Sequence, residues 1–153
     1  MKSKIAELLD KRRLAFLGGG PERVEKQHKA GKLTARERLE RLIDPGTFID
    51  LGRFVTHRAT GFGMEKRKAY GDGVITGLGE VGGRKVAVYF QDFTFMGGSV
   101  GEMHASKIAR LIQLALKIGI PLIGVNDSGA VSYTHLRAHE TEADLVCRLL
   151  LEK

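Results

Sequence analysis

Tryptophan is absent from this chain of 153 residues, cysteine occurs once and proline three times. A single thiol, Cys147, cannot form an internal disulfide, which excludes a disulfide-stapled scaffold and favours a cytoplasmic location. No apolar run approaches the roughly 20 residues of a membrane span, so we expect no membrane insertion. The first residues, Met1 to Glu7, carry an acidic residue and lack an apolar signal core, so we expect no secretory peptide.

Positive charge is concentrated in the first half of the chain. Residues 1–70 hold 17 Lys and Arg against nine Asp and Glu, whereas residues 71–153 hold eight against nine. A basic segment can bind a nucleic acid or an anionic cofactor, or it can be a solvated helical surface. Because glutamates are interleaved with the basic residues and aromatic partners are missing, we expect no nucleic-acid partner.

Helical patterns dominate the front of the chain. Residues 3–17 have apolar residues at helical spacing and end at a run of three glycines. The polar stretch that follows can continue as helix. Thr34 and Glu37 form a capping box, which predicts another helix that closes at Asp44-Pro45-Gly46. We therefore expect residues 1–46 to form a helical arm rather than part of a core.

Short apolar runs typical of strands replace this pattern after residue 46. Val74–Leu78 and Val86–Phe90 flank a pair of glycines, which predicts a hairpin. The second run is continuously apolar, as expected of a strand covered on both faces. An amphipathic helix follows, and then Leu122–Val125, which we interpret as a buried strand. Strand, helix, strand in this order predicts a parallel crossover and an α/β fold.

Two glycine turns fall at the carboxyl ends of these parallel strands, where ligands usually bind in such sheets. In Gly97-Gly98-Ser99, the serine and Glu102 predict a second capping box. That turn is either an ordinary helix start or a cradle of backbone N–H groups for an anion. Asp127-Ser128-Gly129 lacks the glycines of a nucleophile elbow, so we interpret Ser128 as a turn residue and the N–H groups around Gly129 as the functional feature.

Two further patterns do not carry the chemistry that they suggest. Gly77–Gly82 matches the dinucleotide pattern G-x-G-x-x-G, but a strand rather than a helix follows, so these glycines fit a hairpin. His135 and His139 are spaced as zinc ligands can be, yet only the distant Cys147 could join them. We therefore expect neither a dinucleotide site nor a metal site.

Four other ionisable side chains have ordinary interpretations. Lys107 and Arg110 lie one to two turns into the predicted helix, where either could meet a phosphate, although a solvated surface is the more common role. His57 and His104 are isolated in the sequence. We expect each histidine to be a surface residue or a core residue with satisfied hydrogen bonds.

Five short motifs follow one another between residues 25 and 129: Leu33–Leu39, Tyr70–Gly77, Gln91–Ser99, Gly101–Glu102 and Gly124–Gly129. In their order and spacing they resemble the carboxyltransferase subunit family of biotin-dependent acyl-CoA carboxylases and decarboxylases. Several ordered motifs at family-like spacing are more specific than any one of them.

The resemblance implies a crotonase-like fold of ββα units, incomplete here, in a homo-oligomer that is a hexamer in the family. It implies an enzyme that moves a carboxyl group between biotin and the α-carbon of a short acyl-CoA of the propionyl-CoA or methylmalonyl-CoA type. The biotin would be presented by a biotin carboxyl carrier protein or a biotin carboxylase subunit. The reaction passes through an enolate, whose oxygen backbone N–H groups can stabilise by several kcal/mol.

The resemblance also assigns roles to residues of the two turns. Gly129 is expected to be one donor of the oxyanion hole. Gly97, Gly98 and Ser99 are expected to cradle CoA or biotin, with Phe93 and Phe95 as pocket wall or, alternatively, as core residues.

Three parts follow from this interpretation: a helical arm (1–46), a partial carboxyltransferase domain (47–129) and a tail (130–153). Ala130 stands where the family has a second glycine, and the tail resembles translated adapter sequence. We hypothesise that the tail is not native and that the 153-residue chain is an inactive fragment. The alternative is a non-catalytic CoA-binding or subunit-interaction module that docks through its basic arm.

Overall fold

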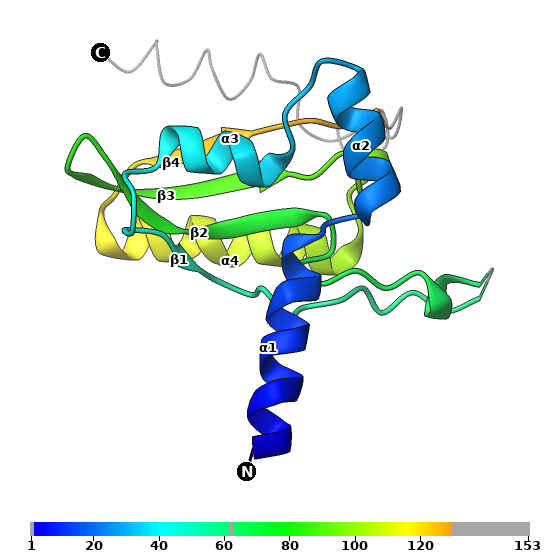
Figure 1. The fold of residues 1–153 in the computed structure, drawn as a ribbon. Helices are drawn as coiled ribbons and strands as arrows, with labels where there is room; N and C mark the ends of the chain where they lie inside the picture. Colours follow the sequence, from blue (N-terminus) through cyan, green and yellow to red (C-terminus); the bar gives the residue numbers. More distant parts are fainter. Residues whose placement is uncertain (1, 62, 130–153) are drawn as a thin grey trace.

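A four-stranded sheet with helices on both faces forms the body of the chain in the computed structural model, which describes residues 2–61 and 63–129 (Figure 1). The strands lie in the order β1-β2-β3-β4 and comprise Ile49–Asp50, Val74–Val81, Arg84–Gln91 and Leu122–Val125. β2 pairs antiparallel with both β1 and β3, whereas β3 and β4 pair parallel. The predicted hairpin, the parallel strand–helix–strand unit and the α/β class are confirmed.

Four α-helices and two short 3-10 helices accompany the sheet in the described residues: α1 (Lys2–Phe16), α2 (Pro21–Lys29), α3 (Ala35–Leu42), α4 (Glu102–Ile118), η1 (Met64–Lys66) and η2 (Met96–Gly98). α1 projects away from the sheet as an arm (Figure 1). The predicted capping box begins α3, because the Glu37 N–H donates to the Thr34 hydroxyl and the Thr34 N–H donates to the Glu37 carboxylate. The left-handed Gly119 ends α4, as predicted.

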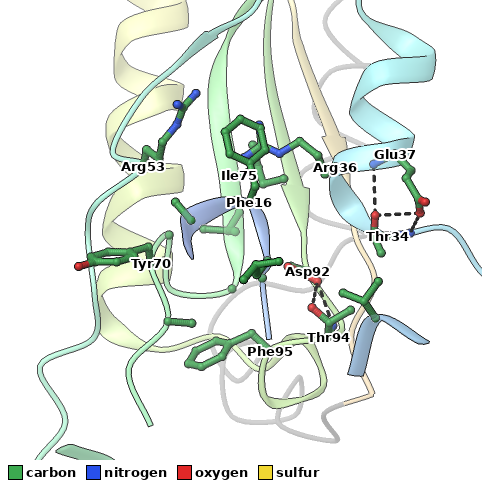
Figure 2. A pocket seen from close by; sticks show the side chains of 18 of the residues that line it. Phe16, Thr34, Arg36, Glu37, Arg53, Tyr70, Ile75, Asp92, Thr94 and Phe95 are labelled. Atoms are coloured by element: carbon green, nitrogen blue, oxygen red, sulfur yellow. Dashed lines mark hydrogen bonds between the residues drawn. The ribbon is translucent and has the colours of Figure 1, made fainter. Parts of the chain in front are cut away.

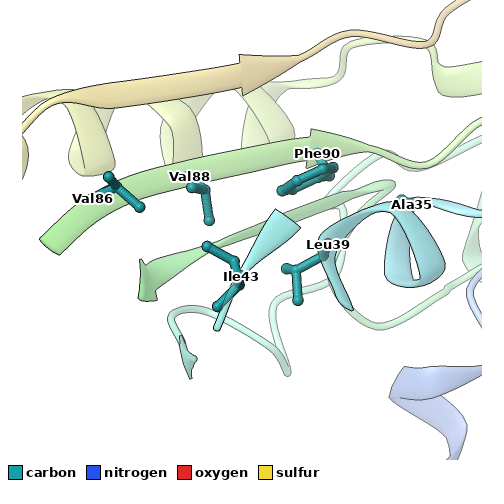
Figure 3. Packing of buried hydrophobic residues seen from close by; sticks show 6 residues of the cluster. All are labelled: Ala35, Leu39, Ile43, Val86, Val88 and Phe90. Atoms are coloured by element: carbon teal, nitrogen blue, oxygen red, sulfur yellow. The ribbon is translucent and has the colours of Figure 1, made fainter. Parts of the chain in front are cut away.

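The core lies on both faces of β3. Alternate residues of this strand, Val86, Val88 and Phe90, pack against α3 on one face (Figure 3). On the other face Ala87 packs against Leu111 and Ala115 of α4. The side-chain period of two in a strand explains this division. The prediction that both faces of the run are covered is confirmed.

The expectation that the front helices stay outside the core is wrong for α3. Ala35, Leu39 and Ile43 recur every four residues, so they form one apolar stripe that the sheet buries. In α1, by contrast, Leu8 and Leu9 are about half exposed, and this helix fits the predicted arm. A division of the chain at residue 46 stays a prediction.

β4 is not the buried strand that its apolar sequence predicts. Within the described residues it pairs with β3 alone and forms one edge of the sheet. Leu122 is 37% exposed as a result. The edge position still brings the end of β4 next to the end of β3, which is what matters for the site.

Candidate functional site

The two predicted glycine turns meet at the carboxyl ends of β3 and β4. The Gly129 N–H donates to the Gly97 carbonyl at 2.9 Å. Gln91, the last residue of β3, accepts a hydrogen bond from the Asp127 N–H at 3.2 Å through its side-chain oxygen. The parallel pairing of the strands thus joins segments that lie about thirty residues apart in the chain.

Gly98 makes this junction possible. Its φ of 72° lies in the left-handed region, and a Cβ built on it would lie 2.1 Å from the Asp127 carbonyl oxygen. Met96 and Gly97 also have positive φ, of 50° and 65°, so three successive residues adopt left-handed backbone conformations. A side chain at position 98 would push the second turn away from the first.

Ser99 does not cap the following helix, and the predicted second capping box is wrong. α4 begins at Glu102 with Gly101 as its N-cap residue and no side-chain cap, because Ser99 lies in extended backbone before it. The Asp72 carboxylate takes that role from a distant loop by accepting the His104 N–H at 2.9 Å. A sequence-local pattern could not reveal an acceptor 32 residues away.

Three backbone N–H groups of the two turns, those of Gly98, Ser99 and Gly129, donate to carbonyls of the protein. The Gly98 N–H donates to Phe95 O and the Ser99 N–H to Met96 O, at 3.0 and 3.3 Å. The bond from the Gly129 N–H to the Gly97 carbonyl brings the predicted oxyanion donor next to the predicted cradle. Their roles toward CoA, biotin or an enolate stay predictions.

Phe93 and Phe95 line two different cavities. Phe93 faces a cavity of about 490 Å³ beside α2, which we call the Arg23 cavity. Phe95 faces a cavity of about 430 Å³ between α1, α3 and the sheet, which we call the Asp50 cavity. Thr94, which lies between them in the chain, borders both cavities, and its hydroxyl donates to the Asp92 carboxylate at 2.6 Å (Figure 2).

The Asp50 cavity is charged but internally neutralised. Arg36 and Arg53 both pair with the buried Asp50 carboxylate, at 3.3 and 2.9 Å. Figure 2 shows Phe16 between the two arginines, and each guanidinium carbon lies about 5 Å from the ring centroid, at 4.6 and 5.1 Å. Stacked and paired arginines of this kind act as structural cross-links between α1, α3 and β1.

Lys107 also belongs to the Asp50 cavity, and its interpretation as a solvated residue is wrong. Its ammonium donates to the Gly71 carbonyl at 2.8 Å and to the Val74 carbonyl. Burial lowers the pKa of Lys107 to about 8, although the Asp50 and Asp72 carboxylates act in the opposite direction. Arg110, three residues on, is exposed as expected of a surface residue.

Both isolated histidines are core residues. His104 is fully buried, and its Nδ1 donates to the Asp72 carbonyl at 3.1 Å. Burial lowers the pKa of this imidazole, so the neutral form is favoured. His57 lies 3.2 Å from the Arg67 carbonyl through Nε2 and stacks on Phe95. These contacts indicate packing roles for both residues.

Asp127 is the main residue that the sequence interpretation missed. Its carboxylate binds Arg38 at 2.7 Å, lies 3.9 Å from the Lys32 ammonium and accepts a hydrogen bond from the Gln27 amide. It thereby ties the end of β4 to α2 and α3. Only the proximity of Asp127 to the second glycine turn was visible in sequence, because its partners lie up to 100 residues away.

Two absences concern only the described part of the chain. Residues 2–61 and 63–129 contain no group of three or more His, Cys, Asp or Glu that could hold a metal ion. His135, His139 and Cys147 lie outside this part. No helix within the same ranges is long and apolar enough to span a membrane.

Comparison with known proteins identifies relatives of this arrangement. The carboxyl transferase domain family matches residues 26–140. A propionyl-CoA carboxylase beta chain from Cereibacter sphaeroides is 53% identical over 129 residues, which are 84% of this chain and 25% of that protein. A methylmalonyl-CoA decarboxylase subunit alpha from Veillonella parvula is 51% identical with the same coverage.

A solved structure extends the likeness to the fold. Transcarboxylase 12S, a hexamer crystallised with methylmalonyl-coenzyme A, matches with a TM-score of 0.80 and 46% identity over 84% of this chain and 25% of that chain. The predicted crotonase-like fold is thereby confirmed. The chain spans about a quarter of the length of these relatives. The family match runs past Gly129 into the segment that we hypothesised to be non-native, which lies outside the described residues.

Proposed function

The chain belongs to the carboxyl transferase domain family, and on this premise we propose that it forms part of an acyl-CoA carboxyltransferase. The reaction moves a carboxyl group between biotin and the α-carbon of a short acyl-CoA of the propionyl-CoA or methylmalonyl-CoA type. The proposal rests on one observation above all: two glycine turns are joined at the carboxyl ends of parallel strands through the Gly129–Gly97 hydrogen bond.

The chemistry requires donors for a developing negative charge. Loss of CO₂ or of a proton from the α-carbon places charge on the thioester oxygen, and fixed N–H groups stabilise it. We assign the Gly129 N–H to this oxygen, with Gly97, Gly98 and Ser99 holding the neighbouring part of CoA or biotin. Binding would then exchange the Gly97 carbonyl for the thioester oxygen as the acceptor of the Gly129 N–H.

The phenylalanines have separate roles in this assignment. Phe93 is a wall of the Arg23 cavity and would lie against the ligand, because a Cβ built on Gly129 would be 3.1 Å from its ring. Phe95 packs in the Asp50 cavity against His57 and supports the turn from behind. One residue therefore contacts the ligand, and the other fixes the loop.

The partners follow from the same proposal. Biotin reaches the site on a carrier protein or a biotin carboxylase subunit, and the chain assembles with copies of itself, as the hexameric transcarboxylase 12S does. The enzyme acts in the cytoplasm. Residues 1–46 form its arm, of which α3 packs on the sheet, and residues 47–129 form part of its acyl-CoA domain.

The test is carboxyl transfer by a chain extended to the length of its relatives. We expect it to convert methylmalonyl-CoA to propionyl-CoA only when biotin is present, with the carboxyl group recovered on biotin as carboxybiotin. The 153-residue chain alone is expected to bind acyl-CoA without turnover. If the extended chain carboxylates and decarboxylates no short acyl-CoA, the proposed function is wrong.

A subunit-interaction role is the second candidate, and the surface of α1 favours it. Ile5, Leu9 and Leu14 are each more than half exposed on this helix. A chain with this role would join a larger complex and would bind acyl-CoA without any turnover, even when extended. The same decarboxylation assay therefore separates the two candidates.

A further inference from the structure

Lys107 reaches the Asp50 cavity from the opposite face of the sheet. α4 packs on the face of β3 that carries Ala87, whereas α3, which borders the cavity, packs on the other face. Among the described residues, Lys107 is the one that α4 contributes to the lining. Its stem passes Gly52, where a built Cβ would lie only 3.1 Å from Lys107 Cε. The missing side chain at position 52 therefore leaves room for the lysine.

Two carbonyls hold the terminal nitrogen of Lys107 in place. The Lys107 Nζ donates to the carbonyls of Gly71 and Val74, and both of these residues line the same cavity. A neutral amine has two N–H groups and one lone pair. When the two N–H groups serve the two carbonyls, the lone pair points away from both. A fixed amine with a free lone pair beside a cavity is the arrangement that a nucleophilic lysine needs.

The surroundings of Lys107 favour its neutral form. The titratable and charged groups near it are Asp50 of β1, Asp72 of the loop before β2, Arg36 of α3, Arg53 after β1 and His104 of α4. Burial is the largest influence and lowers the pKa of Lys107 to about 8, while the two carboxylates raise it and Arg36 lowers it. At pH 7 about one in ten of these amines is neutral, against about one in 3,000 for a lysine with the ordinary pKa of 10.5.

The Asp50 cavity has room and an apolar wall for a short acyl group. Its volume of about 430 Å³ is in the range of small-molecule sites, and Phe16, Val24 and Ile75 form apolar parts of the lining. Other nucleophilic side chains in the lining are already bonded to carboxylates. The Thr34 and Thr94 hydroxyls donate to Glu37 and Asp92, and His28 lies 2.9 Å from Glu37. Lys107 is thus the side chain best placed to react with an electrophile.

We propose that Lys107 is a site of covalent acylation, at which its amine takes a short acyl group from a thioester such as propionyl-CoA that enters the Asp50 cavity. This inference rests on the proposed function, because that function supplies the acyl donor. The neutral amine attacks the thioester carbonyl carbon, the new C–N bond forms and the C–S bond breaks. One amine proton ends on the departing thiolate, so the products are an amide and a free thiol.

The acylated side chain differs from the lysine in charge and in hydrogen bonding. The positive charge near Asp50 and Asp72 is lost. The amide keeps one N–H, so either the Gly71 or the Val74 carbonyl loses its donor. Acylation therefore changes the contact between α4 and the start of β2.

The decisive experiment incubates the full 153-residue chain with the propionyl thioester of N-acetylcysteamine and follows each lysine by peptide mass spectrometry. This small thioester carries the reactive group without the nucleotide part of CoA. We expect Lys107 to be acylated at least about tenfold faster than Lys117, which is exposed on the same helix. The rate at Lys107 should rise with pH and level off above about pH 8, where most of the amine is neutral. Propionyl-CoA should modify the same lysine.

Two variants that narrow the cavity test the route to Lys107. Ala69 and Val24 line the cavity from a loop and from α2, so Ala69→Phe and Val24→Phe should each slow acylation of Lys107 and leave that of Lys117 unchanged. Ala6→Phe is the matched control, because Ala6 is exposed on α1 and lies outside the lining. It should leave both rates unchanged. Circular dichroism verifies that each variant is folded.

Two results overturn the inference: acylation of Lys107 no faster than that of Lys117, or equal acylation of Lys107 in the unmodified chain and in both cavity variants. Neither result depends on carboxyl transfer. If an extended chain transfers carboxyl groups but Lys107 stays unmodified, only the acylation site is wrong. If Lys107 is acylated as expected but an extended chain transfers no carboxyl group, the acylation site stands and the proposed function is wrong.

Discussion

At the scale of single residues, Gly97 and Gly98 have the same backbone strain but different surroundings. Their φ angles are 65° and 72°, both in the left-handed region. No atom lies within 4 Å of a Cβ built on Gly97, whereas the Cβ of Gly98 would collide with the Asp127 carbonyl. Comparing a substitution at Gly97 with one at Gly98 therefore distinguishes two costs. One is the backbone strain of a residue other than glycine at positive φ, and the other is the displacement of the two turns from each other.

We predict that Gly98→Ala destabilises the chain by roughly 3 kcal/mol or more, because both strain and collision act. Gly97→Ala should cost only about 1–2 kcal/mol for its left-handed conformation. Urea unfolding gives the two free energies. Hydrogen exchange of the Gly129 amide should accelerate in Gly98→Ala alone, and equal exchange in both variants would show that the turns do not depend on this contact.

Lys107 gives the second prediction at this scale, in the pH dependence of stability. Its pKa is about 8 in the folded chain against 10.5 ordinarily, so between these values the unfolded state binds more protons. Stability therefore rises with pH from about 8 to about 10.5, by up to about 1.4 kcal/mol per pH unit. The neutral amine keeps two N–H groups for its two carbonyl partners.

Lys107→Met should remove this rise, whereas Lys117→Met, at an exposed position of α4, should keep it. The free energy of unfolding of the three proteins, measured by urea titration at several pH values in this window, tests the prediction. If the free energy of unfolding rises equally with pH in the unmodified chain and in Lys107→Met, the rise comes from other titrating groups.

At the scale of elements, the three front helices differ in what they bury. α3 contributes Ala35 and Leu39 to the core with β3, whereas α1 leaves most of its leucines in solvent. Helix propensity is similar for both, so tertiary packing rather than local preference decides which is indispensable.

Leu39→Ala and Leu9→Ala make this difference measurable. Leu39 is 3% exposed, and its truncation should cost about 2–5 kcal/mol through lost burial and a cavity. Leu9 is 56% exposed, so the same truncation should cost less than about 0.5 kcal/mol. Thermal unfolding of both variants provides the comparison. Equal losses would mean that α1 is buried in solution against another surface.

The elements also show what sequence could predict. Periodicity and turn glycines were enough for the β2–β3 hairpin, α4 and the meeting of the two turns. The spacing of apolar residues does not show whether a helix joins the core or projects as an arm, which is why α3 was misassigned. It also does not distinguish an edge strand from a buried one, which is why β4 was misassigned. The Asp72 cap of α4 and the Asp127 ion pairs lay beyond reach, because both depend on contacts across more than 30 residues.

At the scale of the whole molecule, apolar side chains remain on the outer surface of α4. Leu116 is 78% exposed, and Ile112 and Ile118 on the same helix are also exposed. Ile112 and Leu116 are four residues apart and so share one face of the helix. Exposed apolar side chains that lie together favour association. We assign a second copy of this chain as its partner at high concentration, since like surfaces bury each other without any other component.

Sedimentation velocity should therefore show a mass that rises with concentration. Leu116→Lys should reduce this association, because it places a charge in the apolar contact. Gln113→Lys, at an exposed polar position one turn earlier, adds the same charge and should leave association unchanged. Similar masses for the unmodified chain and Leu116→Lys would locate the contact elsewhere.

The long-range ties of the front segment set an order of events during synthesis. The β2–β3 hairpin joins residues at most 17 positions apart and can close while the chain is still growing. The Gly19 N–H, however, binds the Thr94 hydroxyl 75 positions later, and Gln27 binds Asp127 100 positions later. At about 5–20 residues per second, Gln27 waits about 5–20 seconds for its partner to be made. The contact of α2 with the end of β4 is therefore among the last to form, and until then chaperones and proteases can reach this helix.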